Sequence, residues 1–527
     1  MNTPPTGNVS TLVATLLLCI LGNGMAQAAP AEDVYKESQS VLLAKAATIT
    51  PPLPTYNCSA KASWFTSPSF PSEVAQSNGP GDSSFCDFYQ FSWQTFAYLM
   101  AQSKNDPSVI NFQDNTQFNQ LELNADGTPG NSCDDIHDSQ VLFIRTAKHE
   151  ENDTDIVIPE MIGQAGGGAT IYDQNGNVVY YDVRFSKNMC EVKKIQQKQN
   201  FPGGTTEMKT AWKVLTDSDD PSQYVTMDAN ITPVVSDQSD NKLTKLGMIG
   251  FHIAVATPNH PEFVWATFEH KVNAPDCTLP DVTKGWSFAS QACAAGLKNN
   301  QAMCQFNNPT KGTEITGTPS QICRMYPYGS SVIDPQFDEN TDSIKTLNAN
   351  VQPYLTDNFK VLKNYFNVGA LWVSDIQQGS YTTPTDGQPT TQISNQRGSL
   401  RLANTVAETE YQNINTAAIN LNGDSSPSAG FVSNCFGCHN FQGKESGISN
   451  TTSNSLSHIF DDIAVGSNQC LDVQAANIIN SQVQAEAECP STCGKSSTLL
   501  KWNGQWTNQN ATTKAQLGKT VCGCCNK

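Results

Sequence analysis

The sequence predicts an α+β protein with a large β-rich body that ends in a mostly helical segment, followed by a small disulfide-stapled α+β domain. Three observations predict this: apolar residues at helical spacing over 86–100, short alternating apolar runs between 141 and 268, and a new group of cysteines after 466. We expect four parts, namely a signal peptide over 1–28, a Pro- and Ser-rich lead-in over 29–79, the body over 80–466 and the small domain over 467–527.

The N-terminal segment has the features of a secretory signal. An apolar stretch from Thr11 to Ile20 is followed by small residues, and the Ala-x-Ala pattern before Ala29 is typical of a cleavage site. No other run reaches the roughly 18 apolar residues that a membrane span needs, so we expect no span after cleavage. The sequence therefore predicts a periplasmic or secreted protein, and its 17 cysteines fit an oxidising compartment.

The net charge of −18 limits the class of partner. An acidic surface repels phosphates, so nucleic acid and anionic membranes are disfavoured. The same charge would attract a basic protein, such as a redox partner.

The elements of the body follow from local patterns. Phe and Trp side chains at helical spacing predict a core helix from Cys86 to Met100, and Asn175-Gly176 is typical of a hairpin turn. The four cysteines from Cys277 to Cys323 indicate a disulfide-tied loop excursion. We expect strands over 141–144, 156–159, 170–172, 178–183, 212–215, 248–256 and 263–268, and further helices over 342–355 and 400–411.

A CxxCH run at residues 435–439 is the most informative motif of the chain. Two thiols at this spacing can form thioether bonds to the two vinyl groups of one porphyrin, and the adjacent imidazole can bind the iron. We therefore expect one covalent haem c, attached through Cys435 and Cys438 with His439 as the proximal ligand, in a helical haem-c segment. A disulfide or half of a zinc site are the alternatives.

The sixth iron ligand is left open by the sequence. No Met follows the motif, so His458 is one candidate, and a His or Met from the body is another. In the body, His252, His260 and His270 lie close together in sequence, and a hairpin would make His252 and His270 cross-strand neighbours, with Glu269 on the opposite face from His270. An iron with no sixth ligand would instead resemble a peroxidase, where a distal His acts as general base.

Several blocks of the body resemble a known family. Residues 85–93, 265–270, 273–276 and 402–405, together with the late CxxCH, are similar to the large bacterial cytochrome c family proteins that carry a single CxxCH. The resemblance covers about residues 80–463. It implies haem and electron transfer, and it implies no particular substrate.

The small C-terminal domain has a second cysteine set. Cys489 and Cys493 are four residues apart on a predicted helix, while Cys522 and Cys524 share one face of a strand, so two parallel disulfides could clamp the helix to the sheet. Cys525 would point away, towards Cys470. So small a domain needs such staples for stability, and a four-cysteine zinc site is the alternative.

Trp502 and Trp506 flank an Asn-Gly-Gln turn, where an indole and an amide could contact a sugar. The simpler alternative is that both Trp side chains are core. The segment over about 475–524 is also similar to the cyanobacterial mannan-binding lectin family, although the family usually has Trp where this chain has Asn480. The resemblance implies a lectin-like domain and a mannose-oligosaccharide site, which would be lined by Ile479, Asn480, Gln482, Gln505, Trp506 and Thr507.

Together these features predict an exported mono-haem c-type cytochrome that carries single electrons and has a carbohydrate-binding module. Two alternatives remain open at this point. One is a haem peroxidase or oxidase acting on a saccharide or on peroxide, with His252 and His270 as acid/base groups, and the other is a glycan-binding protein with a structural haem.

Overall fold

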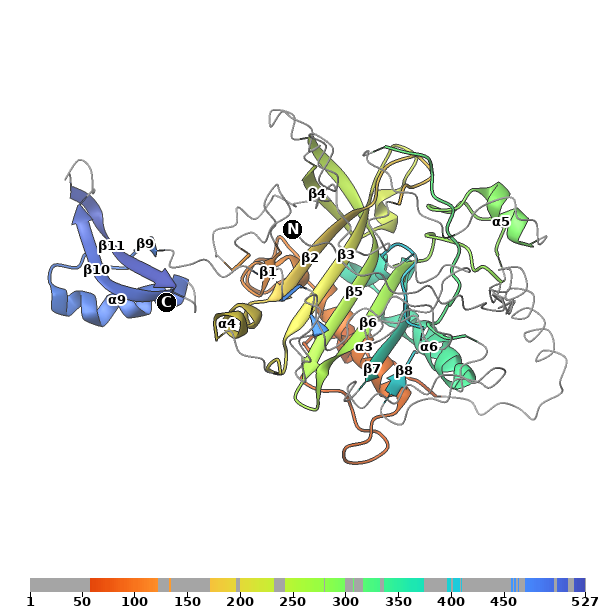
Figure 1. Ribbon diagram of the computed structural model, residues 1–527, viewed down its shortest axis with the longest axis horizontal. Coiled ribbons are helices and arrows are strands. Elements are labelled where there is room, and N and C mark those ends of the chain that lie inside the picture. Colours follow the sequence, from red (N-terminus) through yellow and green to blue (C-terminus); the bar gives the residue numbers. More distant parts are fainter. Residues whose placement is uncertain are drawn as a thin grey trace, which may run out of the picture.

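The described part of the chain forms two separate β-sheets, a large one in the body and a small one near the C-terminus (Figure 1). The predicted β-rich body and disulfide-stapled C-terminal unit are thereby confirmed. A computed structural model describes residues 57–121, 132–133, 171–195, 200–231, 242–278, 280–298, 307, 316–331, 336–373, 396–399, 401–407, 409, 456–457, 459–460, 463, 470–496, 500–509 and 516–526.

The large sheet has eight strands, and each paired neighbour is antiparallel. Its order is β1-β2-β3-β5-β6-β7-β8, with β4 paired to β5. The long hairpin of β5 and β6 forms its centre. The strands are β1 (Phe118–Gln120), β2 (Tyr180–Ser186), β3 (Thr206–Val214), β4 (Thr226–Ile231), β5 (Lys242–Thr257), β6 (His260–His270), β7 (Tyr365–Val373) and β8 (Gln396–Gly398).

The predicted core helix is present as α3 (Phe85–Met100). It begins with a capping box, because the Ser84 hydroxyl accepts a hydrogen bond from the Asp87 backbone N–H and the Asp87 carboxylate accepts one from Ser84 N–H. The predicted helix over 342–355 is also present as α6 (Phe337–Val351), which begins earlier. The other α-helices described in the body are α2 (Ser63–Thr66), α4 (Asn188–Ile195) and α5 (Gln291–Lys298).

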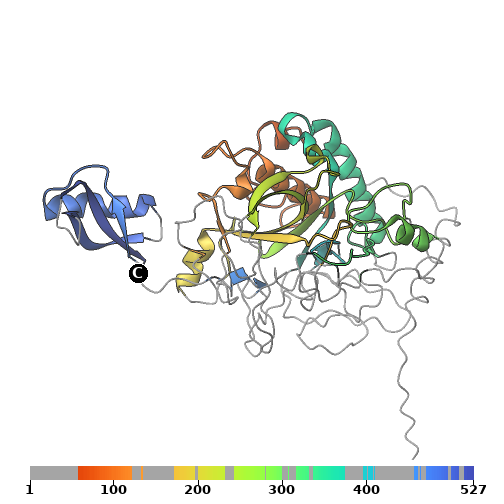
Figure 2. The same ribbon diagram turned by 90° about the horizontal axis from the view of Figure 1, so that it is seen from above.

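Helices α3 and α6 cover one face of the large sheet (Figure 2). Aromatic side chains fill the interface: the ring of Phe96 on α3 stacks on Phe268 of β6 at 4.0 Å, and Trp93 meets the same ring edge-on at 5.0 Å. All three side chains are fully buried. Burying rings of this size contributes a large share of the hydrophobic stabilisation.

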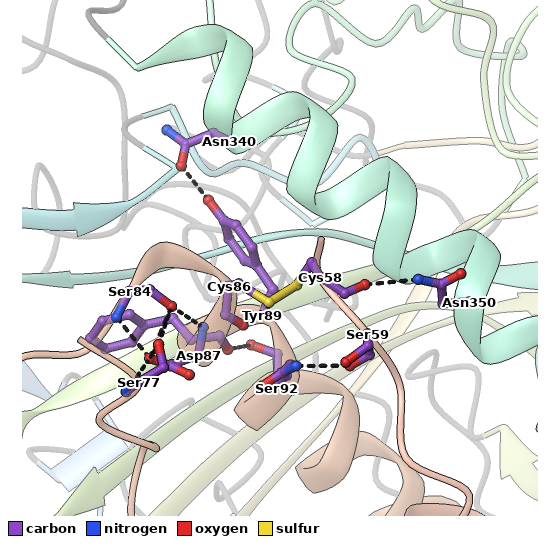
Figure 3. The surroundings of a disulfide bond; sticks show 12 residues. Cys58, Ser59, Ser77, Ser84, Cys86, Asp87, Tyr89, Ser92, Asn340 and Asn350 are labelled. Carbon is purple, nitrogen blue, oxygen red and sulfur yellow. Dashed lines mark hydrogen bonds between the residues drawn. A yellow bond between two sulfur atoms is a disulfide. The ribbon is translucent and has the colours of Figure 1, made fainter. Parts of the chain in front are cut away.

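A disulfide joins the described end of the lead-in to α3 (Figure 3). Cys58 bonds to Cys86, and Asn350 of α6 donates a hydrogen bond from its amide to the Cys58 carbonyl oxygen at 2.9 Å. On the next turn of α3, the Tyr89 hydroxyl donates to Asn340 Oδ1 at 2.5 Å. Residues 57–79 therefore pack as part of the body and do not form a free linker.

The opposite face of the large sheet is covered by later parts of the chain. Ala254 on β5 and Phe263 and Trp265 on β6 belong to a buried cluster with Leu402 and Phe460. Residues on both sides of the CxxCH motif in sequence therefore pack on this one face of the sheet.

The helix predicted over 400–411 is wrong in its described part, because residues 401–407 form turns and coil. Polar side chains fix this segment to the sheet. The Asn404 amide donates to the Thr267 hydroxyl at 2.9 Å, and Thr405 N–H donates to the Glu269 carboxylate at 2.7 Å. Tertiary hydrogen bonds thus override a helical apolar pattern.

The strands predicted over 178–183, 212–215, 248–256 and 263–268 are confirmed as β2, β3, β5 and β6, with shifted bounds. Tyr172 bridges to Val178 across the predicted turn, where Gly176 has a φ of 81°. Cys277 and Cys323 form a disulfide that closes the predicted loop excursion. The predicted strands over 141–144 and 156–159 lie outside the described residues.

The small C-terminal sheet has the order β10-β11-β9, and both of its strand pairs are antiparallel. Its elements are β9 (Cys470–Gln474), α9 (Gln482–Ser496), β10 (Leu500–Gln509) and β11 (Gln516–Asn526). We call residues 470–526 the C-terminal module. In the part of the chain that the structure describes, none of the helices combines the length and the apolar character needed to cross a membrane.

One prediction for the body concerns acid stability. His270 stacks on Tyr224 at 4.4 Å, and burial lowers its pKa from 6.5 to about 4. The unfolded chain therefore binds a proton between about pH 6.5 and pH 4 that the folded chain does not, so stability is complete above this window and falls by roughly 3 kcal/mol as pH drops through it. His270→Gln should reduce this loss in denaturant titrations at pH 8, 6 and 4.5, and an unchanged loss would contradict the prediction.

Candidate functional site

Two disulfides clamp α9 to β11 in the C-terminal module. Cys489 bonds to Cys522 and Cys493 bonds to Cys524, so the predicted parallel clamp is confirmed. All four side chains are fully buried. Since their sulfur atoms are bonded to one another, the alternative of a four-cysteine zinc site is wrong. The register of β9 with β11 also places Cys470 opposite Cys525.

The turn between Trp502 and Trp506 is a bulge in β10. Trp502 pairs with Cys524 and Trp506 pairs with Cys522, so three residues of β10 oppose the single residue Gly523. A Cβ atom on Gly523 would lie 2.6 Å from Asn503 Oδ1, so any larger residue here would displace the Asn503 side chain. The bulge holds residues 503–505 at the surface.

Hydrogen bonds fix the bulge. Trp502 Nε1 donates to the Gln505 carbonyl oxygen at 2.7 Å, and Gln505 N–H donates to Asn503 Oδ1 at 2.9 Å. The Gln505 side chain itself is exposed. Its amide can therefore meet a ligand while the backbone beneath it stays in place.

Gln482 and Trp506, two of the predicted site residues, are in direct contact. Trp506 Nε1 donates to Gln482 Oε1 at 2.9 Å, which joins the first residue of α9 to β10. The Gln482 amide nitrogen in turn donates to Glu486 Oε1 at 3.3 Å. The half-buried indole packs against the module core on one side, so its orientation is set by both packing and a hydrogen bond.

The segment before α9 is held at its backbone. Ile479 N–H donates to the Thr520 hydroxyl at 2.7 Å, and the Asn508 amide donates to the Ile479 carbonyl oxygen at 2.8 Å. The Ile479 side chain is only 1% exposed and lies in the core. Asn480 is exposed, and its backbone N–H donates to Gln484 Oε1 at 2.8 Å.

The predicted site residues therefore divide into two kinds. Asn480, Gln482 and Gln505 present exposed amides, while Trp506 and Thr507 are half-buried beside them on the module. The Thr507 hydroxyl accepts a hydrogen bond from Gln509 N–H at 3.0 Å. Ile479 acts as a core residue that fixes the opening segment.

A groove of about 940 Å³ lies between the opening segment and α9. Asn477 donates hydrogen bonds from its backbone and its amide to Glu488 Oε1, at 3.0 and 3.2 Å. Sequence patterns do not identify Asn477 or Glu488, because these residues are eleven positions apart and their contact depends on the folded chain. These polar groups extend the surface on which a ligand could lie.

The histidines of the body do not form the predicted pair. β5 and β6 place His252 opposite Thr267, while His270 pairs with Tyr365 of β7. Because His270 is three residues from Thr267, its side chain lies on the other face of the sheet from His252. The predicted cross-strand pair of His252 and His270 is therefore wrong.

The other titratable groups of this region have structural partners. His260 lies at the β5–β6 turn, where its Nδ1 is 2.8 Å from Glu73 Oε1. Glu269 is fully buried and accepts hydrogen bonds from the Arg324 guanidinium, at 3.1 and 2.7 Å. The three histidines thus contribute to separate local structures and not to one cluster.

His252 remains a candidate metal ligand on the sheet face opposite α3. It pairs with Lys209 of β3, and burial, with a contribution from the Lys209 charge, lowers its pKa to about 3. The imidazole is therefore neutral at physiological pH, which is the form that binds iron. Among the described residues, no group of three or more His, Cys, Asp or Glu side chains could hold a metal ion.

The predicted haem-binding residues Cys435, Cys438 and His439 lie outside the described residues, as does His458. Two thiols and an adjacent imidazole are the donor set that covalent haem requires. The residues present in the sequence therefore fit the cofactor by their chemistry.

One comparison with known proteins matches the C-terminal module. Residues 482–524 match the family model for mannan-binding protein, so this segment is similar to that family. The match begins at the first residue of α9 and ends in β11, and it includes Gln482, Trp506 and all four clamp cysteines. Searches of curated proteins and of solved structures returned no match.

The clamp generates a stability prediction. Replacing Cys493 and Cys524 together by Ser should cost the module roughly 2–4 kcal/mol, because the unfolded segment loses a cross-link. Hydrogen exchange of β11 amides, measured by mass spectrometry on the full chain, should become faster. The matched pair Cys277→Ser and Cys323→Ser should leave exchange in the module unchanged, and equal effects of both pairs would contradict a local clamp.

Proposed function

We propose that the protein is an exported carbohydrate-binding protein whose C-terminal module recognises mannose-type oligosaccharides. The observation that carries this proposal is the match of residues 482–524 to the mannan-binding family, at the place where Trp506 and Gln482 form one fixed unit. The disulfides Cys489–Cys522 and Cys493–Cys524 support an oxidising, extracytoplasmic location.

The chemistry of the module suits an uncharged sugar. An indole ring offers an apolar surface to sugar C–H groups, and amides supply both a donor and an acceptor to each hydroxyl. Trp506 provides the ring, while Asn480, Gln482 and Gln505 provide the amides. Because the backbone beneath these groups is fixed by hydrogen bonds, little ordering entropy would be lost on binding.

Variants of Trp506 test the proposal. Trp506→Ala should weaken binding of a mannose oligosaccharide by about tenfold or more, and Trp506→Phe should weaken it less because a ring remains. Isothermal titration calorimetry on the full chain gives the affinities, and hydrogen exchange of β10 checks that the module is folded. Trp372→Ala, a change at a half-buried indole of β7 in the body, is the matched control. Unchanged affinity in a folded Trp506→Ala protein would rule out this site.

We further propose that the body carries one covalent haem c, bound through Cys435 and Cys438 with His439 on the iron. When bound, this group supplies reversible one-electron transfer between ferric and ferrous iron. The CxxCH motif and the extracytoplasmic disulfides support the proposal. Single electrons would pass to or from a partner protein, and the net charge of −18 favours a basic one.

Packing on either side of the motif favours the sheet face opposite α3 as the neighbourhood of the haem. Before the motif, Asn404 is hydrogen-bonded to Thr267, the cross-strand neighbour of His252. After it, Ile459 and Phe460 pack in the cluster on this face. His252 is thus a sixth-ligand candidate alongside His458. The separation of His252 and His270 removes the acid/base pair on which the enzymatic alternative relied.

The haem proposal predicts a mass and a spectrum. The purified native protein should exceed the mass of its mature polypeptide by one haem and show reduced cytochrome c bands, and Cys435→Ser with Cys438→Ser should remove both. His252→Ala should change the low-spin spectrum if His252 is the sixth ligand, with His458→Ala as the matched alternative. A bare polypeptide mass would end the redox part of the proposal and leave the carbohydrate part intact.

A further inference from the structure

A pocket in the body lies between the disulfide-tied segment and α6. Its volume is about 510 Å³, which is within the usual range for small-ligand sites. Residues of the segment after β6, of the turn near 324–328, of α6 and of β7 line it. We call it the α6 pocket. It belongs to neither the C-terminal module nor the proposed haem region.

The wall of the α6 pocket is rigid. Cys277 is bonded to Cys323, and the neighbouring residues Asp276 and Arg324 form a parallel bridge. The Arg324 guanidinium binds the Asp276 carboxylate at 2.9 Å and the buried Glu269 carboxylate at 2.7 Å. A ligand would therefore meet a surface that a disulfide and an ion-pair network already hold in place.

The carboxylates of the pocket are engaged by nearby cations. Asp276 is paired with Arg324, and Asp281 lies 3.5 Å from the Lys284 ammonium and also accepts hydrogen bonds from Thr283. Arg324 is likewise compensated, by Asp276 and Glu269. The acidic lining groups are thus neutralised within the pocket wall.

Four cations line the pocket, against the carboxylates of Asp276 and Asp281 and the buried Glu269 behind Arg324, so one positive charge is left over. Lys271, Lys284 and Lys345 all line it from exposed positions, and the Lys271 ammonium donates a hydrogen bond to the Lys363 carbonyl oxygen at 2.6 Å. Burial lowers the pKa of Lys271, and the charge of Lys284 lowers it further, so these two cations repel each other. A local excess of positive charge is unusual on a chain of net charge −18, and an anion would relieve it.

Aromatic rings stand beside these cations. The Lys284 ammonium lies 5.7 Å from the centre of the Trp286 ring, and the Lys345 ammonium lies 5.2 Å from the centre of the Tyr328 ring. Trp286 is fixed because its Nε1 donates to the Asp281 carbonyl oxygen at 3.0 Å. Each half of the pocket thus pairs an apolar ring with a cation.

We propose that the α6 pocket binds an anionic saccharide of the uronic-acid class. Lys284 and Lys345 would pair with the sugar carboxylate, while Trp286 and Tyr328 would lie against its C–H faces. Charge alone would suit any small anion. The two aromatic rings next to the lysines favour a ligand whose carboxylate is attached to a sugar ring, because one face of such a ring presents apolar C–H groups. This site is independent of the mannose site, because it shares no residue with the C-terminal module.

The test uses the full chain and a trimer of galacturonic acid, with the neutral trimer of galactose as the uncharged comparison. The acidic trimer should bind saturably in calorimetry, and the neutral one should bind at least about tenfold more weakly. Binding should also weaken with added salt. Absence of saturable binding, or equal binding of both trimers, would overturn the proposal.

Variants locate the binding. The double variant Lys284→Ala with Lys345→Ala should bind the acidic trimer about tenfold or more weakly than the unchanged protein. The single variant Lys345→Arg should keep most of the affinity that Lys345→Ala loses, because the positive charge remains. Lys104→Ala, an exposed lysine outside the pocket, is the charge-matched control. If acetate or inorganic phosphate binds as tightly as the trimer, the site is a simple anion site and the saccharide class is wrong.

Mannose-oligosaccharide affinity in the same variants separates the two proposals. The lysine variants should keep it, and Trp506→Ala should keep binding of the acidic trimer. Either site can thus fail while the other stands. An effect of the lysine variants on both ligands would contradict two independent sites.

Discussion

The carboxylate of Glu269, which has no exposed surface, holds two separate parts of the chain against the central sheet. Its oxygens accept hydrogen bonds from the Arg324 guanidinium and from the backbone and hydroxyl of Thr405. A buried ion pair is costly to desolvate, but loss of one partner leaves an uncompensated charge and costs roughly 3–5 kcal/mol. The disulfide-tied segment and the stretch before the CxxCH motif are therefore fixed by one side chain of β6.

This arrangement links two neighbourhoods of the body through one side chain. Through Arg324 and Asp276, Glu269 supports the wall of the α6 pocket. Through Thr405, it supports the stretch that leads to the proposed haem region. Both neighbourhoods therefore depend on residues whose role is positioning, and Glu269 itself has no exposed surface with which to meet a ligand.

The sequence predicts best those features that depend on local spacing. The helix of α3 follows from aromatic residues at helical intervals, and the module clamp follows from cysteines four apart on a helix and two apart on a strand. Prediction fails where tertiary contacts decide. Asn404 and Thr405 bind side chains far away in sequence, and this competes successfully with a helical pattern. The register of β5 with β6 likewise separates His252 from His270, although both lie in one hairpin.

The short chain between the body and the C-terminal module limits the distance between the two proposed sugar-binding sites. Ile463 is buried in the body, and Cys470 begins β9 of the module. The seven peptide steps between them span at most about 25 Å when fully extended. A glycan held by the module is therefore kept near the body, which raises its effective concentration there without any further contact. A polymer that carries both neutral mannose and acidic sugar units would benefit most, because each site would hold it for the other.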